Sequence, residues 1–464
     1  MQTVDLLVIG CGAAGLATAV QFLQSHPEGI VAVLERTSER DRGGNTAWSG
    51  SFFRLTEDYE PLPDMETRMR ELSQGKTDEV IIEHLAQNAE PTVRWLSECG
   101  VPIHTALPYI LSAKIPRVMP VGGGGAIVEG LSRRVTELGG RIHYETTAQS
   151  LRTDESTGAV TGVIAEGSDG QPIEFAASTV VLACGGFEGN PEMLDKYLGE
   201  RGHELQTLVP GGRSNRGDGI EMATRIGAAI DGQFDRFHGE PVDPRSRQPE
   251  ALVMIYPYGI LVDHRGLRFV DEGAGGADNT FETISYEIWR QADQFAYLIA
   301  DQKLAKVPDL DRALLTDKAP EVADTIEGLA KRLGIESDAL AATVEAYNAA
   351  ATPGPLDVHN LDGVATQGLT PPKSNWARPI DEPPYVAWPV TCAITFTFGG
   401  LKIDERARVL RESGEPIEGL YAAGELAGLW HHVYPGAISV LSALVFGRAA
   451  GQQAADRVGA SAQA

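Results

Sequence analysis

Apolar positions in the first 36 residues follow the spacing of a strand, a helix and a second strand. Val4–Ile9 is a short continuous apolar run, and apolar residues recur at helical spacing over Leu16–Gln24. A second apolar run, Ile30–Leu34, ends at the acidic residue Glu35. This order predicts two strands joined by a tight turn and a helix, the first unit of a doubly wound sheet.

The turn after the first strand is GCGAAG, residues 10–15, which fits the pattern G-x-G-x-x-G. In this pattern Gly10 permits the turn, Gly12 lets the backbone approach a pyrophosphate, and Gly15 lets helix and strand pack closely. The N–H groups and dipole at the helix N-terminus would bind the pyrophosphate. Glu35 follows Gly15 by 20 residues and would accept hydrogen bonds from ribose hydroxyls. The pattern predicts a dinucleotide site.

A second glycine turn, Gly43-Gly44-Asn45-Thr46, follows close behind the acidic strand end. A nicotinamide domain does not need this turn, whereas a flavin must be held along its whole length. Two later segments, 177–189 and 418–428, are predicted strands that also end in glycine turns. Strand ends that converge on a dinucleotide are expected at the carboxyl edge of a doubly wound sheet. These features favour FAD over NAD.

Two amphipathic helices are predicted within residues 324–348. Asp324 or Thr325 would cap the first helix, and Ser337 or Asp338 would cap the second, because short polar side chains accept hydrogen bonds from the first N–H groups of a helix.

Six segments together resemble the succinate dehydrogenase/fumarate reductase flavoprotein family. They are RGGNT (42–46), VVLACGGFEGN (180–190), GDGIEMATRIGA (217–228), GLRFVDEG (266–273), FTFGGLKID (396–404) and YAAGE (421–425). The resemblance implies an α/β fold in which a smaller α+β capping domain interrupts a Rossmann-type FAD-binding domain. The FAD-binding domain would comprise 1–238 and 378–464, and the capping domain 239–377. Both boundaries fall in segments rich in proline and charge.

The resemblance also implies which residues hold FAD. They are Gly10, Gly12, Ala13, Ala14, Gly15, Glu35, Arg36, Gly44, Asn45, Thr46, Gly185, Asp218, Gly424, Glu425, Ser439 and Val440. Respiratory members of the family attach the flavin through a histidine in the second glycine turn. Asn45 occupies that position here, so we expect noncovalent FAD.

Three positions that bind or protonate a dicarboxylate in fumarate reductases carry other residues in this sequence. The arginine of the cap corresponds to Gly276, the histidine before the T-x-G-G motif to Phe396, and the arginine near the C-terminus to Tyr434. A buried dicarboxylate without charge partners is costly. We therefore do not expect plain fumarate reduction.

Tyr434 lies in HHVYPGAIS (431–439), which leads into the predicted final helix. This loop is similar to that of 3-ketosteroid dehydrogenases, where the tyrosine hydroxyl and the N–H four residues on bind a carbonyl, and to that of the tricarballylate dehydrogenase-like group. A phenol is a neutral donor with a pKa of ~10. The phenol and the backbone N–H would together stabilise the enolate-like charge that forms when an α-proton leaves. Hydride would pass from the β-carbon to flavin N5. This predicts desaturation next to a carbonyl or carboxylate.

Further residues are candidates for the base and for carboxylate binding. Tyr256 and Tyr258, in MIYPYGILVD, and the histidines His238, His431 and His432 could move the proton. Arg54 and Arg117 could hold a substrate carboxylate. Each has a plain structural alternative, because tyrosines pack in cores, histidines sit in solvated loops and arginines form ion pairs.

Two other functions fit the same motifs. The enzyme could work in reverse as an ene-reductase of an unsaturated carbonyl or carboxylate compound, or the chain could be a flavin-binding carrier without turnover. VGGGGAIVEG (121–130) lacks a preceding strand and a distal acid, so no second domain for a nicotinamide is expected. The electron acceptor is left open among a quinone, a protein and oxygen.

Composition limits the partners and the compartment. The formal net charge is −25, which repels phosphate backbones and argues against nucleic-acid binding. No apolar run reaches the ~20 residues of a membrane span, and MQTVDLLVIG has no basic n-region or cleavage motif. The four cysteines lie far apart without metal-ligand spacing, which indicates a reducing cytoplasm and no metal site.

Overall fold

The computed structural model describes residues 1–291, 293–352 and 354–461. The chain divides into two compact units. The first contains Met1–Ala106, Arg117–His238 and Thr395–Ala464, and the second contains Leu107–Pro116 and Gly239–Ile394.

A mixed sheet forms the centre of the first unit, in the strand order β17-β18-β8-β1-β2-β5. Its strands are β1 (Gln2–Ile9), β2 (Val31–Leu34), β5 (Arg141–His143), β8 (Pro172–Leu182), β17 (Arg408–Leu410) and β18 (Pro416–Ala422). β1 pairs in parallel with β2 and β8, β2 with β5, and β8 with β18. Leu6, Leu7 and Val8 of β1 are fully buried, as expected for a parallel strand covered on both faces.

The predicted strand–helix–strand unit is confirmed. Helix α1 (Ala13–Ser25) joins β1 to β2 and starts three residues before the predicted Leu16. The difference arises because the glycine turn itself supplies the first turn of the helix, with Gly12 as the N-cap residue.

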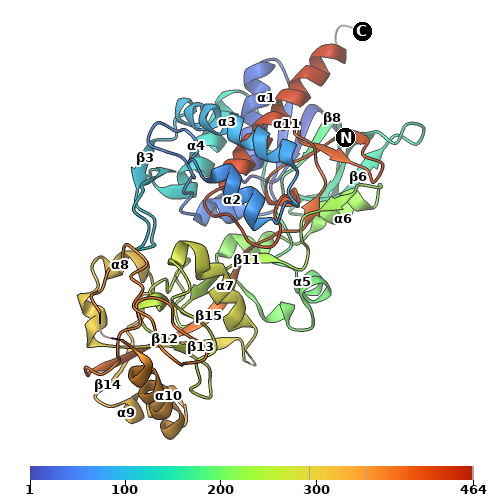
Figure 1. The fold of residues 1–464 in the computed structure, drawn as a ribbon. Coiled ribbons are helices and arrows are strands. Elements are labelled where there is room, and N and C mark those ends of the chain that lie inside the picture. Colours follow the sequence, from blue (N-terminus) through green and yellow to red (C-terminus); the bar gives the residue numbers. More distant parts are fainter. Residues whose placement is uncertain (292, 353, 462–464) are drawn as a thin grey trace. The chain divides into compact units, whose positions relative to one another are not determined.

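The final helix, α11 (Ser439–Ser461), packs along α1, and the two lie side by side in Figure 1. Glycines allow the close approach, since a Cβ atom at Gly447 would lie 2.4 Å from the carbonyl oxygen of Ala14. A Cβ atom at Gly451 would lie equally close, 2.4 Å, to the carbonyl oxygen of Thr18. The Thr18 hydroxyl in turn donates to the Gly447 carbonyl at 2.9 Å.

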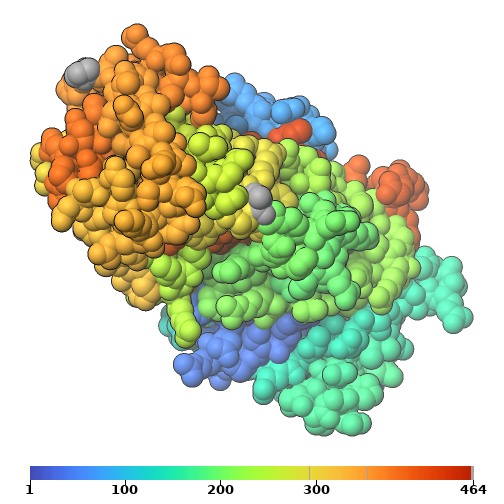
Figure 2. Space-filling model, turned by 90° about the horizontal axis from the view of Figure 1, so that it is seen from below, coloured from blue at the N-terminus to red at the C-terminus, as the bar shows by residue number. Residues whose placement is uncertain are grey.

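The remaining elements of the first unit surround the sheet. They are α2 (Met65–Leu72), α3 (Glu79–Glu98), β3 (Ile103–Ala106), β4 (Arg117–Pro120), α4 (Gly123–Glu137), β6 (Thr147–Thr153), β7 (Val160–Glu166), α5 (Pro191–Leu198), β9 (Gln206–Thr207), α6 (Asp218–Thr224), β10 (Ile230–Asp231) and β16 (Gly400–Leu401). β6 and β7 extend the sheet antiparallel from β8, and the exposed teal turn between them projects from the surface in Figure 2.

One expectation about this unit is wrong. The glycine run at 121–130 does follow a strand, β4, and opens a helix, α4. β4 forms a two-stranded antiparallel sheet with β3, and its Val118 also forms a single antiparallel bridge with Phe53, so the run does not follow a strand of the parallel sheet where dinucleotides bind.

The second unit contains an antiparallel sheet and a helical pair. Its elements are β11 (Phe237–Val242), β12 (Ile260–Val262), α7 (Ala277–Trp289), β13 (Phe295–Asp301), α8 (Leu310–Ala313), β14 (Glu321–Ala323), α9 (Ile326–Leu333), α10 (Ser337–Ala350) and β15 (Tyr385–Thr397), of which β11 and β15 run into the first unit. Residues 378–394 belong here because β15 pairs with β13 and β14, whereas the sequence analysis assigned them to the FAD-binding domain.

The helices α9 and α10 form where two amphipathic helices were predicted. Leu329, Leu340, Val344 and Tyr347 of these helices are buried in one apolar cluster. Thr325 caps α9, because its hydroxyl accepts the N–H of Gly328 at 3.0 Å. The prediction of Ser337 or Asp338 as the cap of α10 is wrong: the helix already includes both residues, and Glu336 precedes it without a side-chain cap.

Membrane-spanning helices are not found among the described residues, since none of the helices combines the necessary length with sufficient hydropathy.

Candidate cofactor pocket and active site

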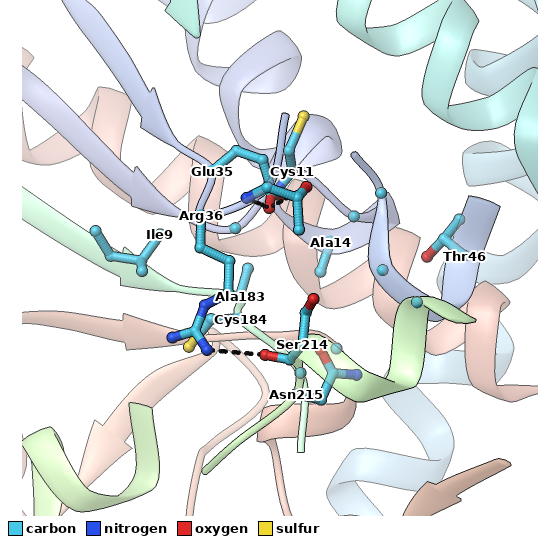
Figure 3. Close-up of a pocket in the computed structure, with 18 of the residues that line it drawn as sticks. Ile9, Cys11, Ala14, Glu35, Arg36, Thr46, Ala183, Cys184, Ser214 and Asn215 are labelled. Atoms are coloured by element: carbon cyan, nitrogen blue, oxygen red, sulfur yellow. Dashed lines mark hydrogen bonds between the residues drawn. The ribbon is translucent and has the colours of Figure 1, made fainter. Parts of the chain in front are cut away.

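An open pocket with an empty volume of about 860 Å³ lies at the carboxyl ends of the parallel strands in the first unit (Figure 3). Most of the residues predicted to hold FAD line it, namely Gly10, Gly12, Ala13, Ala14, Glu35, Arg36, Gly44, Asn45, Thr46, Gly185, Asp218, Gly424 and Glu425. Gly15, Ser439 and Val440 do not line this pocket in the structure. Gly15 belongs to the first turn of α1, and the other two residues begin α11.

The glycine turn at the pocket floor can form only because Gly10 and Gly15 have no Cβ atoms. Gly10 has φ +108°, and a Cβ atom there would lie 2.3 Å from the carbonyl oxygen of Ala183. A Cβ atom at Gly15 would lie 2.0 Å from the carbonyl oxygen of Gly10. The Thr46 hydroxyl accepts the N–H of Ala13 at 3.2 Å, which ties the second glycine turn to the start of α1. The backbone is thereby exposed to the pocket at the helix N-terminus.

Glu35 braces the same turn from the end of β2. Its carboxylate accepts the N–H of Cys11 at 3.1 Å (Figure 3), and both the N–H and the hydroxyl of Thr37 at 2.8 Å. The side chain is nearly buried yet lines the pocket. A carboxylate has about four acceptor positions, so this group keeps the capacity to bind ribose hydroxyls.

Arg36 and Asp218 join two parts of the pocket wall that are far apart in sequence. Their side chains form an ion pair, and Arg36 Nη1 also donates to the carbonyl oxygen of Ser214 at 3.0 Å (Figure 3). The 3₁₀ helix η4 (Pro210–Ser214) and helix α6 are thereby connected to the end of β2.

A cluster of two amides and two carboxyl groups lies at the other part of the wall. Asn45 and Asn215 both donate to Glu188 Oε1, at 2.7 and 2.6 Å. Both also approach Glu425 Oε2, at 3.4 and 3.3 Å. Glu425 Oε1 accepts the N–H of Thr397 at 2.9 Å. Burial raises the pKa of Glu425, and burial together with the charge of Glu425 raises that of Glu188 well above its usual range.

Glu188, Asn215 and Thr397 are not among the residues predicted from the sequence. All three lie within or next to quoted family motifs, but none follows a pattern of its own. The available signal was the acid in GGFEG, close behind the carboxyl end of a predicted strand.

The pocket residues fit FAD. Asn45 Oδ1 is buried without a hydrogen-bond partner among the described residues, which is expected of a group whose partner is a ligand. The amide nitrogen of Asn45 faces three acceptors, Glu188 Oε1, Glu425 Oε2 and the Thr395 carbonyl, which fixes the orientation of the amide. Helix N–H groups for a pyrophosphate, a carboxylate for ribose and a polar amide wall are the donor and acceptor set that a flavin dinucleotide requires.

Tyr434 sits at the N-terminus of α11 in an aromatic setting. Its ring centroid lies 4.6 Å from that of His238, 5.1 Å from Phe396 and 5.3 Å from Trp430. Its oxygen accepts the N–H groups of Ile438 at 2.7 Å and Ser439 at 2.6 Å. The N–H of Ile438, four residues after Tyr434, therefore donates to the phenol oxygen itself. It does not form a second donor beside the phenol O–H. Burial raises the pKa of Tyr434, and a hydrogen bond with the Ser439 side chain, the two backbone N–H groups and the charge of Arg117 oppose the rise.

Two buried arginines lie at the Tyr434 loop. Arg54 is 4 % exposed, forms an ion pair with Asp64 at 2.5 Å, and donates to the carbonyl oxygen of Pro435 at 3.5 Å. Its own N–H donates to the Ala437 carbonyl at 2.9 Å. Arg117, in β4, is also buried and acts electrostatically on Tyr434. Positive charge thus reaches this loop from positions other than Gly276, Phe396 and Tyr434.

The histidines next to Tyr434 have separate surroundings. His431 is nearly buried, lies 3.8 Å from Asp231, and has a pKa lowered by burial. The N–H of His432 donates to Gln233 Oε1 at 2.8 Å. His238 packs directly against the Tyr434 ring, so among the three it is the one whose ring contacts the phenol ring.

Tyr256 and Tyr258 belong to the second unit, in a short 3₁₀ helix before β12. The Tyr256 hydroxyl is 2.7 Å from the Thr280 hydroxyl, and the Tyr258 hydroxyl donates to the Val358 carbonyl at 3.3 Å. Burial raises the pKa of both phenols. Their participation in catalysis stays a prediction.

Known relatives match the chain over most of its length. It is 28% identical to NADH:acrylate oxidoreductase of Vibrio harveyi, over 98% of this chain but only 51% of that protein. It is 30% identical to 3-oxosteroid 1-dehydrogenase of Mycobacterium tuberculosis, over 73% of this chain and 64% of that protein. An open flavocytochrome c3 fumarate reductase superposes with a TM-score of 0.78 at 25% identity, covering 98% of this chain and 78% of that one.

These relatives confirm the resemblance to fumarate reductases and 3-ketosteroid dehydrogenases and the flavoprotein fold. The chain spans about half the length of the acrylate oxidoreductase. A family model described as FAD binding domain matches residues 5–440, so the protein belongs to this family of FAD-binding flavoproteins.

Proposed function

We propose that the protein is an FAD-dependent oxidoreductase that acts on a CH–CH bond next to a carbonyl or carboxylate. The observation that carries the proposal is Tyr434, a buried phenol held at a helix N-terminus by two backbone N–H groups, in a chain whose cofactor pocket fits FAD. The relatives include a 3-oxosteroid dehydrogenase and an acrylate oxidoreductase, and these names support both directions of one reaction.

The bound FAD would supply a two-electron acceptor for the hydride that leaves the β-carbon. The α1 N-terminus, Glu35 and the Asn45–Asn215 wall would hold it. We propose noncovalent attachment, because Asn45 stands where a histidine would form the covalent link and its amide is engaged with Glu188 and Thr395.

Tyr434 would bind the carbonyl oxygen of the substrate. Accepting two N–H bonds strengthens a phenol as an O–H donor, and we propose that Tyr434 gives this O–H to the substrate carbonyl when the substrate binds. As the α-proton leaves, negative charge develops on the carbonyl oxygen, and a hydrogen bond aimed there is worth typically ~10²–10³ in rate. His238, packed on the phenol ring, is the candidate in the first unit for moving the proton. Tyr256 and Tyr258 are the candidates for this role in the second unit.

The two buried arginines favour a substrate that carries a carboxylate. Arg54 contacts the Tyr434 loop through the Pro435 carbonyl, and Arg117 acts on the phenol. A guanidinium binds a carboxylate through two parallel hydrogen bonds. We propose a small keto acid or unsaturated acid as the substrate class. We also propose that the second unit is the capping domain and that the protein works in the cytoplasm. The electron acceptor is a quinone, a protein or oxygen.

The test is an anaerobic panel of saturated and unsaturated ketones and carboxylic acids. Saturated compounds are added to the oxidised holoenzyme and scored by flavin bleaching. Unsaturated compounds are added to the photoreduced holoenzyme and scored by reoxidation. Bleaching by a saturated compound supports desaturation, and reoxidation by an unsaturated acid supports the ene-reductase. If no compound changes the flavin spectrum faster than buffer does, the protein is a flavin carrier and the proposal fails.

A further inference from the structure

We propose that Glu188 and Glu425 form an acid pair that shares one proton at neutral pH, and that this proton positions Asn45 and Asn215 for FAD binding. Glu188 is a positioning residue in this proposal, since it does not line the pocket and acts through residues that do. The inference depends on FAD binding but on no property of the substrate.

The two amides of Asn45 and Asn215 are hydrogen-bonded to the same two carboxyl groups, Glu188 and Glu425. Each amide nitrogen donates a short bond to Glu188 Oε1 and a longer one to Glu425 Oε2, with nearly equal distances on the two sides: 2.7 and 3.4 Å from Asn45, 2.6 and 3.3 Å from Asn215. Two carboxyl groups that share the same two donors lie close together. Like charges at this separation in a buried site cannot both be ionised without a counter-charge.

No counter-charge is present among the described residues. Neither carboxyl group forms an ion pair with an arginine, lysine or histidine in that part of the chain, and Glu188 is 2 % exposed. The cationic residues on or next to the surrounding elements are Arg213 in η4 and Arg216 just after it, and both have exposed side chains. The other groups that pack against the pair, Thr395 and Thr397 of β15, are uncharged.

The proton is assigned to Glu188. Glu425 accepts the N–H and the hydroxyl of Thr397, at 2.9 and 3.2 Å, and these bonds stabilise a carboxylate. Glu188 Oε2 is buried and has no hydrogen-bond partner among the described residues, which suits the neutral form of a buried acid better than the charged form. Burial and the charge of Glu425 raise the pKa of Glu188 in the same sense.

This arrangement leaves Asn45 Oδ1 unpaired in the pocket wall. The Asn45 nitrogen is committed to Glu188 and the Thr395 carbonyl, so the amide of this pocket-lining residue is fixed in one orientation. FAD covers the wall when it binds and removes more water from the pair. The proton is therefore held more tightly in the holoprotein than in the apoprotein. Linkage then requires FAD affinity to fall as pH rises from the pKa of this proton in the apoprotein to its higher pKa in the holoprotein. The fall is at most tenfold per pH unit, because one proton is involved.

The test compares wild type with Glu188→Gln, Glu188→Leu and the control Glu204→Gln, an exposed acid paired with Arg201. The Kd of FAD is measured by fluorescence titration of apoprotein from acid to alkaline pH. We expect the wild-type Kd to rise with pH and that of Glu188→Gln to stay flat, because glutamine keeps an acceptor for both amides and cannot ionise. Glu188→Leu should bind FAD at least tenfold more weakly at every pH, and Glu204→Gln should follow wild type.

A rise of Kd with pH in Glu188→Gln that equals the wild-type rise overturns the proposal. Infrared spectroscopy of the holoprotein gives an independent result should a variant not fold. A buried protonated carboxyl has a C=O band that shifts in D₂O, and its absence at neutral pH from the wild type equally overturns the proposal. Neither measurement uses a substrate, so a failure here is distinct from a failure of the proposed CH–CH chemistry.

Discussion

The oxygen of Tyr434 accepts the backbone N–H of Ser439, the first residue of α11, at 2.6 Å. The first N–H groups of a helix have no partner within the helix, and here a side chain from the preceding loop satisfies two of them. The phenol is thereby fixed in place by the same helix that packs on α1 and borders the cofactor pocket through Ala443.

Replacing Tyr434 by phenylalanine should affect both turnover and stability. Turnover should fall by ~10²–10³, the usual effect of one lost donor to a developing oxyanion. The free energy of unfolding should fall by about 1–3 kcal/mol, because the N–H groups of Ile438 and Ser439 lose their acceptor. FAD content and the flavin spectrum should stay unchanged. Tyr421→Phe, which alters a buried tyrosine outside the pocket lining, is the control. Wild-type turnover in Tyr434→Phe would exclude the hydroxyl from the reaction.

Arg54→Met should discriminate between classes of substrate. Loss of the guanidinium should raise the KM of carboxylic acids by about tenfold or more, equivalent to ~1.4 kcal/mol, and change that of uncharged ketones little. Steady-state kinetics with matched acid and methyl-ester pairs provides the measurement. Asp64→Asn removes the ion-pair partner but keeps the arginine, so it should not raise the KM of the acids. Equal effects of Arg54→Met on acid and ester would show that Arg54 serves the loop alone.

Gly15→Ala should abolish FAD binding. The new Cβ atom would lie 2.0 Å from the carbonyl oxygen of Gly10, so the glycine turn or the start of α1 must move. Gly459→Ala near the end of α11 is the matched control, since nothing lies within 4 Å of its Cβ position. It should raise the free energy of unfolding by up to ~1 kcal/mol through helix propensity. FAD retained after gel filtration and thermal unfolding curves report the two outcomes.

Lys373, in the second unit, should give the stability a pH dependence at alkaline pH. Burial lowers its pKa from 10.5 to about 8, and its ammonium donates to the Gly259 carbonyl. Between these values the unfolded chain binds a proton that the folded chain does not. The free energy of unfolding contributed by this group therefore rises with pH from about 8 to 10.5, by roughly 3 kcal/mol in all.

The measurement is a series of urea unfolding curves for wild type and Lys373→Met from pH 7 to 10.5. The difference between the two proteins should change with pH in the stated direction. Lys306→Met, at an exposed ion pair, should run parallel to wild type. A constant difference between wild type and Lys373→Met across this range would show that folding does not lower the pKa of Lys373.

Acid precipitation of the holoprotein should release all of the flavin. This outcome follows from the noncovalent attachment that we propose: the family resemblance places Asn45 at the position of the linking histidine, and an amide cannot form that link. Absorbance of the supernatant and the absence of in-gel flavin fluorescence after denaturation are the two measurements. Flavin that remains with the pellet would indicate attachment through another residue.

The local pattern predicted those parts of the molecule that are built from neighbouring residues. The strand–turn–helix–strand unit and its acid follow from period and spacing alone, and the cap of α9, Thr325, is one of the two residues that the pattern predicts, with Asp324 as the other. The acid pair was not predicted, because Glu188, Asn215 and Glu425 come from three segments that meet only through the sheet order. Glu336 precedes α10 without a capping bond, so the first turn there depends on packing, which a rule based on polar residue types cannot anticipate.

The close packing of α11 on α1 at Gly447 and Gly451 affects when the cofactor pocket can be completed. Ala14 and Ala443 are both in the pocket lining, and they are 429 residues apart in the sequence. While the ribosome is still making the residues in between, the phosphate-binding turn stands without one of its walls, and long-range contacts of this kind form late. Complete assembly of the cofactor pocket therefore has to wait until α11 has been synthesised and has packed on α1.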